Sequence, residues 1–219
     1  MIELTPDLIL KAYACGVFPM AERHDAAEVY WIDPDFRGVL PLEKFHVSRR
    51  LARTVRAGTF EIKVDQDFPA TIKGCSKRTQ KRRDTWLNAQ LIHVFSELHR
   101  HGYAHSVETW REGRLVGGLY GVAMGAVFFG ESMFSLEPDA SKVALVALVE
   151  RLKRGGFTLL DTQFVTAHLR QFGAVELPRS QYLTLLSEAL SRPASFYSAG
   201  ESAGGAGTTS GAQSSTRTS

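Results

Sequence analysis

The chain alternates between stretches whose apolar residues recur at helical spacing and stretches in which apolar and polar residues alternate. Residues 87–101 show the first pattern clearly, because Leu91, Val94, Phe95 and Leu98 fall on one helix face and Gly102 follows them. Apolar faces, capping residues and glycine stops predict helices over 5–15, 46–56, 68–74, 87–101, 141–154, 166–172 and 179–191.

The second pattern predicts strands. They are expected over 60–65, 104–110, 114–122, 126–134 and 157–164. Glu112-Gly113 and Met124-Gly125 supply tight turns between the three central strands, which therefore form an antiparallel meander. This order of elements predicts an α+β fold of the acyltransferase-like kind, with a central, mostly antiparallel sheet flanked by helices.

The end of the chain has a different composition. From Ser195 onward glycine and small polar residues predominate, and such a segment buries too little apolar surface to offset the entropy of ordering. We therefore expect a Gly/Ser-rich tail over 195–219 that is disordered from about Ala199.

Composition adds a few limits. The chain has 219 residues, of which 44% are hydrophobic and 22% charged, with a net charge of +3, as in ordinary globular proteins. No secretory signal is recognisable at the N-terminus, and no run approaches the roughly 18 apolar residues of a membrane span. Cys15 and Cys75 are expected to be reduced thiols. These features predict a cytoplasmic protein without membrane contact.

Two polar residues end an apolar strand in LLDTQF. Asp161 and Gln163 lie two positions apart, so in a strand they point to the same side and converge on one pocket. A carboxylate in such surroundings is costly unless it is hydrogen-bonded or used in chemistry. The alternative interpretation is an ordinary capping or turn aspartate before the next helix.

Glu131 lies among apolar residues in FFGESMFS. If no bulge intervenes, Glu131, Met133 and Ser135 share one strand face, although Gly130 is a position where a bulge often occurs. Phe128 and Met133, taken singly, are more simply explained as core. A glutamate between them is harder to explain that way.

Two tryptophans stand in polar, turn-rich surroundings. Trp31 lies in VYWIDPDFRG and Trp86 in DTWLN. Aromatic side chains in loops line ligand pockets or anchor the loop to the core, and the sequence leaves both interpretations open for each residue.

Positive charge is concentrated in two places. The first cluster is Arg49, Arg50, Arg53 and Arg56, and the second is Lys73, Lys77, Arg78, Lys81, Arg82 and Arg83. Segregated cations of this kind are typical of a surface that binds a phosphate backbone. The simpler alternative is a solvated basic face.

Several other kinds of site are disfavoured. His99, His101 and His105 are close together, but no cysteine or acid completes a zinc spacing. Ser132 lacks the small-residue surroundings of a hydrolase nucleophile, and no GxxxxGK[ST] phosphate loop occurs.

Four segments carry a resemblance to a known family. AYACGVFPM, WIDPDFRGVLP, HGYAHSVETWREGRLVGGLYGVAMGAVFFGESMFS and LLDTQF resemble the leucyl/phenylalanyl-tRNA–protein transferase family, and the match runs from about Leu4 to Leu190. The resemblance implies a GNAT-type acyltransferase fold, with a reduced N-terminal subdomain over 1–60 and a GNAT-like catalytic domain over 61–194. The Gly/Ser-rich tail is outside the family pattern.

The resemblance also implies a reaction. Members transfer leucine or phenylalanine, and less often methionine, from aminoacyl-tRNA to proteins that start with arginine or lysine, which creates an N-degron for proteolysis. No cofactor or metal is implied, because the aminoacyl ester is already activated.

Residue roles follow from the same resemblance. It implies that Asp161, Gln163 and Glu131 match the catalytic polar residues around the reacting centre. Our hypothesis is that Asp161 orients Gln163 and the incoming amine and receives its proton, while Glu131 contacts the cationic acceptor. The implied substrate-binding residues are Trp31, Trp86, Leu119, Phe128, Met133, Ser135 and Leu160. The expected tRNA-binding residues are Arg49, Arg50, Lys73, Lys77, Arg78, Arg82 and Arg83.

Two other functions were weighed. An acyl-CoA-dependent acetyltransferase of the same fold would need a glycine-rich pyrophosphate loop before a helix, and SLEPDASKVAL lacks one. A non-catalytic RNA-binding or degradation adaptor would explain the basic clusters, but it leaves Asp161 and Glu131 without a purpose.

Overall fold

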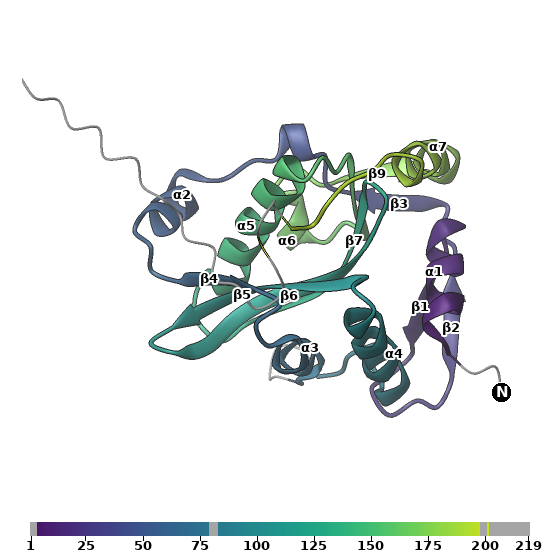
Figure 1. The fold of residues 1–219 in the computed structure, drawn as a ribbon, viewed down its shortest axis with the longest axis horizontal. Helices are drawn as coiled ribbons and strands as arrows, with labels where there is room; N and C mark the ends of the chain where they lie inside the picture. Colours follow the sequence, from purple (N-terminus) through teal and green to yellow (C-terminus); the bar gives the residue numbers. More distant parts are fainter. Residues whose placement is uncertain (1–3, 79–82, 198–200, 202–219) are drawn as a thin grey trace, which may run out of the picture.

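One large sheet organises the molecule (Figure 1). The computed structural model describes residues 4–78, 83–197 and 201. The sheet has the strand order β4 (Glu61–Val64), β5 (Ala104–Arg111), β6 (Arg114–Met124), β7 (Val127–Ser135), β8 (Leu159–Gln163), β3 (Phe36–Val39) and β9 (Val175–Pro178). The β7–β8 pair is parallel and the other neighbouring pairs are antiparallel. The predicted α+β fold with a mostly antiparallel sheet is confirmed.

The predicted meander is present as β5, β6 and β7. Glu112 and Gly113, between β5 and β6, both have positive φ, 51° and 71°, as a two-residue hairpin turn requires. Helix α5 (Ala140–Arg154) then carries the chain back so that β8 pairs parallel to β7. A parallel pair needs such a crossover, which is why a long buried helix separates these two strands.

Helices cover both faces of the sheet. In Figure 1, α3 (Phe68–Ser76) and α4 (Ala89–Arg100) lie on one face, and α5 and the short α6 (Ala167–Arg170) lie on the other. Helix α2 (Arg49–Arg56) packs against α5. Helices α1 (Pro6–Ala14) and α7 (Arg179–Leu190) contact each other near β3 and β9.

The helix starts follow from their capping residues. The Thr5 hydroxyl accepts a hydrogen bond from the Leu8 amide at 3.3 Å, and Asn88 accepts one from the Leu91 amide at 2.9 Å. Ser48 caps α2 in the same way, so this helix begins at Arg49 and not at the predicted His46. The seven predicted helices are all present, with their ends shifted by up to a few residues.

Four short strands were not predicted. They are β1 (Phe18–Ala21) and β2 (Val29–Ile32), which form a separate hairpin, together with β3 and β9 in the main sheet; the 3₁₀ helix η1 (Leu42–Lys44) was also missed. Each of these strands has four residues, which is too short for alternation to be recognised. Three of them also contain Pro19, Gly38 or Pro178, residue types that usually indicate turns.

The predicted boundaries cut through packed structure. Strand β3 falls within residues 1–60, yet it pairs with β8 and β9 of the catalytic part. Phe196, predicted to belong to the tail, is buried against Phe128 and His105, and the Tyr197 hydroxyl donates to Asp65. Residues 198–200 and 202–219 are outside the described residues, so disorder of the tail stays a prediction. No described helix is long and apolar enough to cross a membrane.

Candidate active site

A cavity opens where two parallel strands separate. Strands β7 and β8 pair only over Val127–Phe129 and Leu159–Asp161. Beyond that point β7 has a bulge: Tyr120 of β6 lies opposite Ser132 and Gly121 opposite Gly130, so Glu131 has no partner on β6. The cavity has a volume of about 830 Å³ and is lined by the diverging ends of β7 and β8.

Most of the cavity wall is apolar. A chamber is formed by Leu119, Met133, Leu145, Leu148, Leu160 and Leu169. Trp86 and residues 18–20 of β1 form the wall toward the N-terminal hairpin. A largely apolar cavity with a few polar groups at defined places is typical of a small-molecule binding site.

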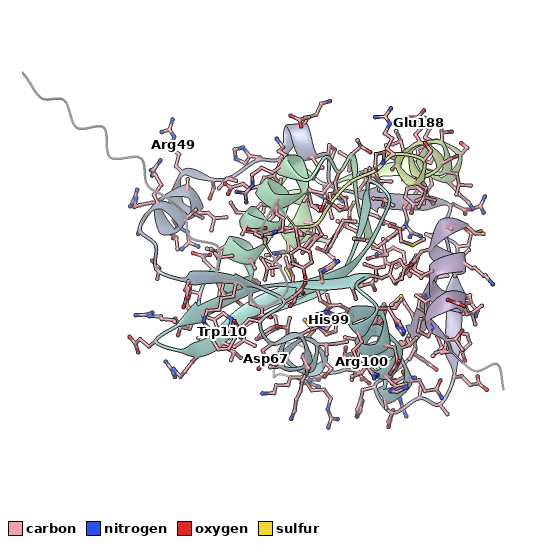
Figure 2. All side chains as sticks on the ribbon, in the orientation of Figure 1. Arg49, Asp67, His99, Arg100, Trp110 and Glu188 are labelled. Carbon is pink, nitrogen blue, oxygen red and sulfur yellow. The ribbon has the colours of Figure 1, made fainter. Side chains whose placement is uncertain are left out.

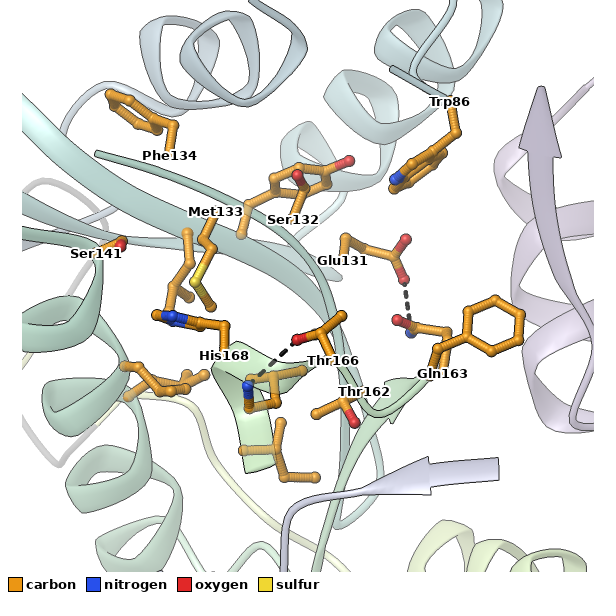
Figure 3. A pocket seen from close by; sticks show the side chains of 18 of the residues that line it. Trp86, Glu131, Ser132, Met133, Phe134, Ser141, Thr162, Gln163, Thr166 and His168 are labelled. Carbon is orange, nitrogen blue, oxygen red and sulfur yellow. Dashed lines mark hydrogen bonds between the residues drawn. The ribbon is translucent and has the colours of Figure 1, made fainter. Parts of the chain in front are cut away.

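Glu131 is the carboxyl group of this cavity. Its Oε1 accepts a hydrogen bond from the Tyr13 hydroxyl at 2.7 Å and one from Gln163 Nε2 at 3.4 Å, and Figure 3 shows Glu131 and Gln163 facing each other. Burial raises the pKa of Glu131 to about 8, the Tyr13 hydrogen bond opposes the rise, and the charge of Asp161 adds to it. The carboxyl is therefore largely protonated at pH 7.

Gln163 adopts an unusual backbone conformation at the end of β8. Its φ is 55°, in the left-handed region that residues other than glycine rarely occupy. Its backbone amide donates to Asp161 Oδ1 at 2.8 Å, which helps to hold this conformation. Strained residues of this kind cluster at functional sites, because the surrounding structure has to enforce them.

Asp161 lies behind the cavity and not on its wall. Its side chain is completely buried, and it accepts hydrogen bonds from Arg37 Nη2 at 2.7 Å and from the Tyr182 hydroxyl at 2.7 Å. Arg37 is itself 1% exposed, donates to the Gly16 carbonyl at 2.8 Å, and packs between the rings of Phe18 and Tyr182. Asp161 thus reaches the cavity only through the backbone amide of Gln163.

Sequence analysis missed Arg37, Tyr13 and Tyr182. Little in the sequence marked Arg37 as the buried partner of Asp161, because Asp33 and Asp35 lie within four positions of it. Arg37 and Asp161 are 124 residues apart, so nothing local joined them. Tyr13 and Tyr182 lie in amphipathic helices, where a tyrosine on the apolar face looks like ordinary core.

The predicted substrate-binding residues divide into two groups. Trp86, Leu119, Met133, Ser135 and Leu160 line the cavity. Phe128 does not line it, because it is completely buried before the bulge and stacks on Phe196. Trp31 lies on β2, is 37% exposed, and is outside the cavity wall.

A second polar group of residues lies at the other side of the chamber. It consists of Ser141 and His168, and in Figure 3 His168 lies toward Ser141 and Met133, away from Glu131. Burial, with the charge of Lys142, lowers the pKa of His168, so its ring is neutral. Among the described residues no group of three His, Cys, Asp or Glu side chains has the arrangement of a metal site.

The basic residues are exposed on two sides of the molecule. Arg49 and Arg50 are on α2, where Arg49 extends away from the body of the protein in Figure 2. Lys73, Lys77, Arg78 and Arg83 are on α3 or follow it, on the opposite face of the sheet. Lys81 and Arg82 are outside the described residues.

Both clusters adjoin the same end of β7. On one side, α3 packs so closely that a Cβ on Gly74 would lie 2.8 Å from the Phe134 ring. On the other side, Arg50 pairs with Asp139, which precedes α5, at 2.9 Å. The end of β7, which lines the cavity, therefore lies between the two groups of cations.

Comparison with known proteins identifies a family. Residues 39–187 match the family model for leucyl/phenylalanyl-tRNA protein transferase, and residues 2–35 match the model for its N-terminal domain. A leucyl/phenylalanyl-tRNA–protein transferase of Rhodopseudomonas palustris is 56% identical over 194 residues, covering 89% of this chain and 86% of the relative. One from Paramagnetospirillum magneticum is 57% identical over 196 residues, covering 90% and 94%.

Similarity to solved structures is weaker. A structure described as L-PGS from Bacillus licheniformis has a TM-score of 0.44 and 14% identity, covering 85% of this chain and 77% of that chain. The GNAT-type assignment of the fold therefore stays a prediction. The sequence matches extend over nearly the whole globular part, and this chain belongs to the leucyl/phenylalanyl-tRNA protein transferase family.

Proposed function

We propose that this protein transfers leucine or phenylalanine, and less often methionine, from aminoacyl-tRNA to the N-terminal arginine or lysine of acceptor proteins, which marks them for proteolysis. The family match over 2–35 and 39–187 is the observation that carries this proposal. The cavity supports it, because an apolar chamber adjoins a carboxyl and an amide group. We place the reaction in the cytoplasm and assign the fold to the GNAT type on the order of meander, helix and parallel strand.

The apolar chamber would hold the side chain of the transferred amino acid. Leu119, Met133 and Leu160 form its walls together with Leu145 and Leu148 of α5. Shape alone discriminates against a missing methylene by only about 1–3 kcal/mol. We therefore expect leucine and phenylalanine as main donors and measurable use of methionine.

Glu131 is suited to handle the proton of the incoming amine. The acceptor α-amino group has a reference pKa of about 7.7–8.0, and the pKa of Glu131 is about 8, so a proton passes between them with little driving force either way. In the proposed step the amine nitrogen bonds to the ester carbonyl carbon and loses a proton to the Glu131 carboxylate. The bond from that carbon to the tRNA ribose oxygen breaks, and this oxygen takes the proton back from Glu131.

Asp161 would then act at one remove. Because it is sealed behind β8, we assign it as a positioning residue that fixes the backbone of Gln163. Gln163 in turn points its amide at Glu131. This role replaces direct proton transfer to Asp161, since its carboxylate is completely buried and accepts hydrogen bonds from Arg37, Tyr182 and the Gln163 amide.

The basic clusters would hold the tRNA acceptor arm. They lie on both sides of the cavity-lining end of β7, where the ester of a bound aminoacyl-tRNA has to enter. Trp31 is exposed on β2 of the N-terminal hairpin, opposite Pro19, and remains a proposed contact for the donor.

Transfer of labelled leucine from Leu-tRNA to a peptide that starts with arginine tests the function directly. An acyl-CoA-dependent acetyltransferase, the main alternative, would bind acetyl-CoA and acetylate the same peptide without using the tRNA. Transfer from Leu-tRNA is the expected result. Acetylation without such transfer would overturn the proposal.

The tRNA surface needs a separate test. Reversing charge at Lys77, Arg78, Arg82 and Arg83 should weaken use of aminoacyl-tRNA but spare a minimal aminoacyl-adenosine donor, because phosphate contacts give steeply salt-dependent affinity. Arg154, exposed at the C-terminal end of α5 and therefore at the other end of this helix from Asp139, provides a control reversal. Equal losses with both donors across a salt series would count against a tRNA site in this segment.

A further inference from the structure

The carboxyl group of the cavity is held from outside its own strand. Glu131 is the extra residue of the β7 bulge and has no partner on β6. Its shortest hydrogen bond comes from the Tyr13 hydroxyl, at 2.7 Å, across 118 positions of sequence. Gln163 Nε2, the other donor, is at 3.4 Å, near the limit of a hydrogen bond.

Tyr13 is rigidly placed. Its side chain has no exposed surface, and its ring stacks on Phe129 with centroids 4.6 Å apart and planes 12° from parallel. Phe129 immediately precedes the bulge on β7. Helix α1 therefore packs its tyrosine onto the same strand that carries Glu131, and the hydroxyl reaches the carboxyl that the bulge turns toward it.

We infer that Tyr13 is a positioning residue for the transfer reaction: its hydroxyl holds the Glu131 carboxyl facing Gln163 and the cavity, so that α1 completes the site. This inference rests on the proposed function. It gives the N-terminal part of the chain a direct role in the chemistry, in addition to any part it has in binding the donor.

The charged and titratable groups around Glu131 indicate how the Tyr13 hydroxyl affects the ionisation of this carboxyl. Arg37 on β3 favours the carboxylate, whereas burial and Asp161 on β8 favour the neutral acid. Tyr120 on β6 also lies close enough to interact electrostatically with Glu131, but its hydroxyl makes no hydrogen bond. Tyr182 on α7 faces Asp161 instead. The Tyr13 hydroxyl is therefore the nearest donor that favours the ionised form, which accepts the proton of the amine.

Tyr13→Phe and Tyr120→Phe form a matched pair. Both remove one buried hydroxyl near Glu131 and keep the ring, but only the first removes a hydrogen bond to the carboxyl. A loss through packing would affect both variants alike, whereas a positioning role affects the pH dependence in Tyr13→Phe alone.

Transfer from an aminoacyl-adenosine donor to an arginine-starting peptide should be measured from pH 6 to pH 9. In Tyr13→Phe we expect the midpoint of the acid limb to move up by about one pH unit, with the kcat at pH 7 falling about tenfold and the KM for the donor unchanged. Tyr120→Phe should keep the wild-type midpoint. A wild-type midpoint in Tyr13→Phe, or the same shift in both variants, would overturn the inference.

A spectroscopic titration separates this inference from the proposed function. The infrared band of the protonated Glu131 carboxyl can be assigned by its loss in Glu131→Gln and followed against pH. The band should persist to higher pH in Tyr13→Phe than in wild type or Tyr120→Phe. Absence of transfer in the wild-type protein would overturn the function, whereas an unchanged band in Tyr13→Phe would overturn the positioning role alone.

Discussion

Asp161 and Glu131 are carboxyl groups on neighbouring strands, and their surroundings differ in one respect that separates their roles. Asp161 receives hydrogen bonds from Arg37, Tyr182 and the Gln163 amide, and it is completely buried. Among the described residues, Glu131 accepts hydrogen bonds only from Tyr13 and, over a long distance, from Gln163, and it faces the cavity. The first carboxylate is saturated with donors and serves as a fixed part of the fold. The second has room for a substrate and a pKa near that of an amine.

Burial alone therefore does not identify a carboxyl group that can exchange a proton with a substrate. A buried carboxylate with a full set of donors has nothing left to offer a ligand. A carboxyl that is buried without hydrogen-bond donors has a raised pKa, because its charged form is disfavoured. Such groups are found where proton transfer occurs. Asp161→Ala is therefore a poor test of catalysis, because it leaves the buried Arg37 charge without its ion-pair partner and destabilises the fold.

Removing the cation beside Asp161 should have the largest effect. Arg37→Met leaves a buried carboxylate without its ion pair, and we expect the free energy of unfolding to fall by about 3–5 kcal/mol. Urea unfolding measures this loss. The double variant Arg37→Met with Asp161→Asn should recover most of it, and additive losses in the pair would show that the two side chains are not coupled.

Glu131→Gln should separate activity from stability. The amide keeps the shape of the side chain but takes no proton, so we expect transfer to fall at least about 100-fold. The melting temperature should stay equal or rise, because an amide buries more easily than a carboxyl with few donors. Transfer assays and thermal melts on the same preparation measure the activity and the melting temperature. Near-wild-type turnover would show that Glu131 does not take part in the reaction.

Tyr182→Phe tests how saturated Asp161 is. The change removes one hydrogen-bond donor to a buried carboxylate and keeps the ring stacked on Arg37. We therefore expect the free energy of unfolding to fall by about 1.5–3 kcal/mol. Equilibrium unfolding provides the number. Little change in the pH dependence of transfer should accompany it, and a shifted profile would mean that Tyr182 influences the reaction as well as the fold.

The pH dependence of stability should reveal the raised pKa of Glu131. The pKa of Glu131 is about 8 in the folded protein and about 4.3 in an unfolded chain, so the folded state binds more protons between these values. Its contribution to stability is therefore fully present below about pH 4 and is lost as pH rises toward 8, by at most about 1.4 kcal/mol per pH unit. Glu131→Gln should lack this slope; parallel curves for the two proteins from pH 5 to pH 8 would contradict the raised pKa.

The family resemblance implied most, but not all, of the cavity walls correctly. Leu119, Met133 and Leu160 line the cavity as expected. Phe128 shares the sheet face of Met133, but it precedes the point where β7 and β8 separate and is covered by the ring of Phe196. Gly130 hinted at the bulge, but only the pairing with β6 fixed it.

By itself the sequence determined the helices, the meander, the family and the residues Glu131, Asp161 and Gln163, because apolar periodicity, caps, turns and motifs are local and can be read along the chain. The tertiary structure decided what those residues do. Arg37, Tyr13 and Tyr182 come from segments far from Glu131 and Asp161, and their hydrogen bonds set which carboxyl is saturated and which stays protonated. A pKa depends on the atoms that surround a group in space, and no spacing along the chain specifies them.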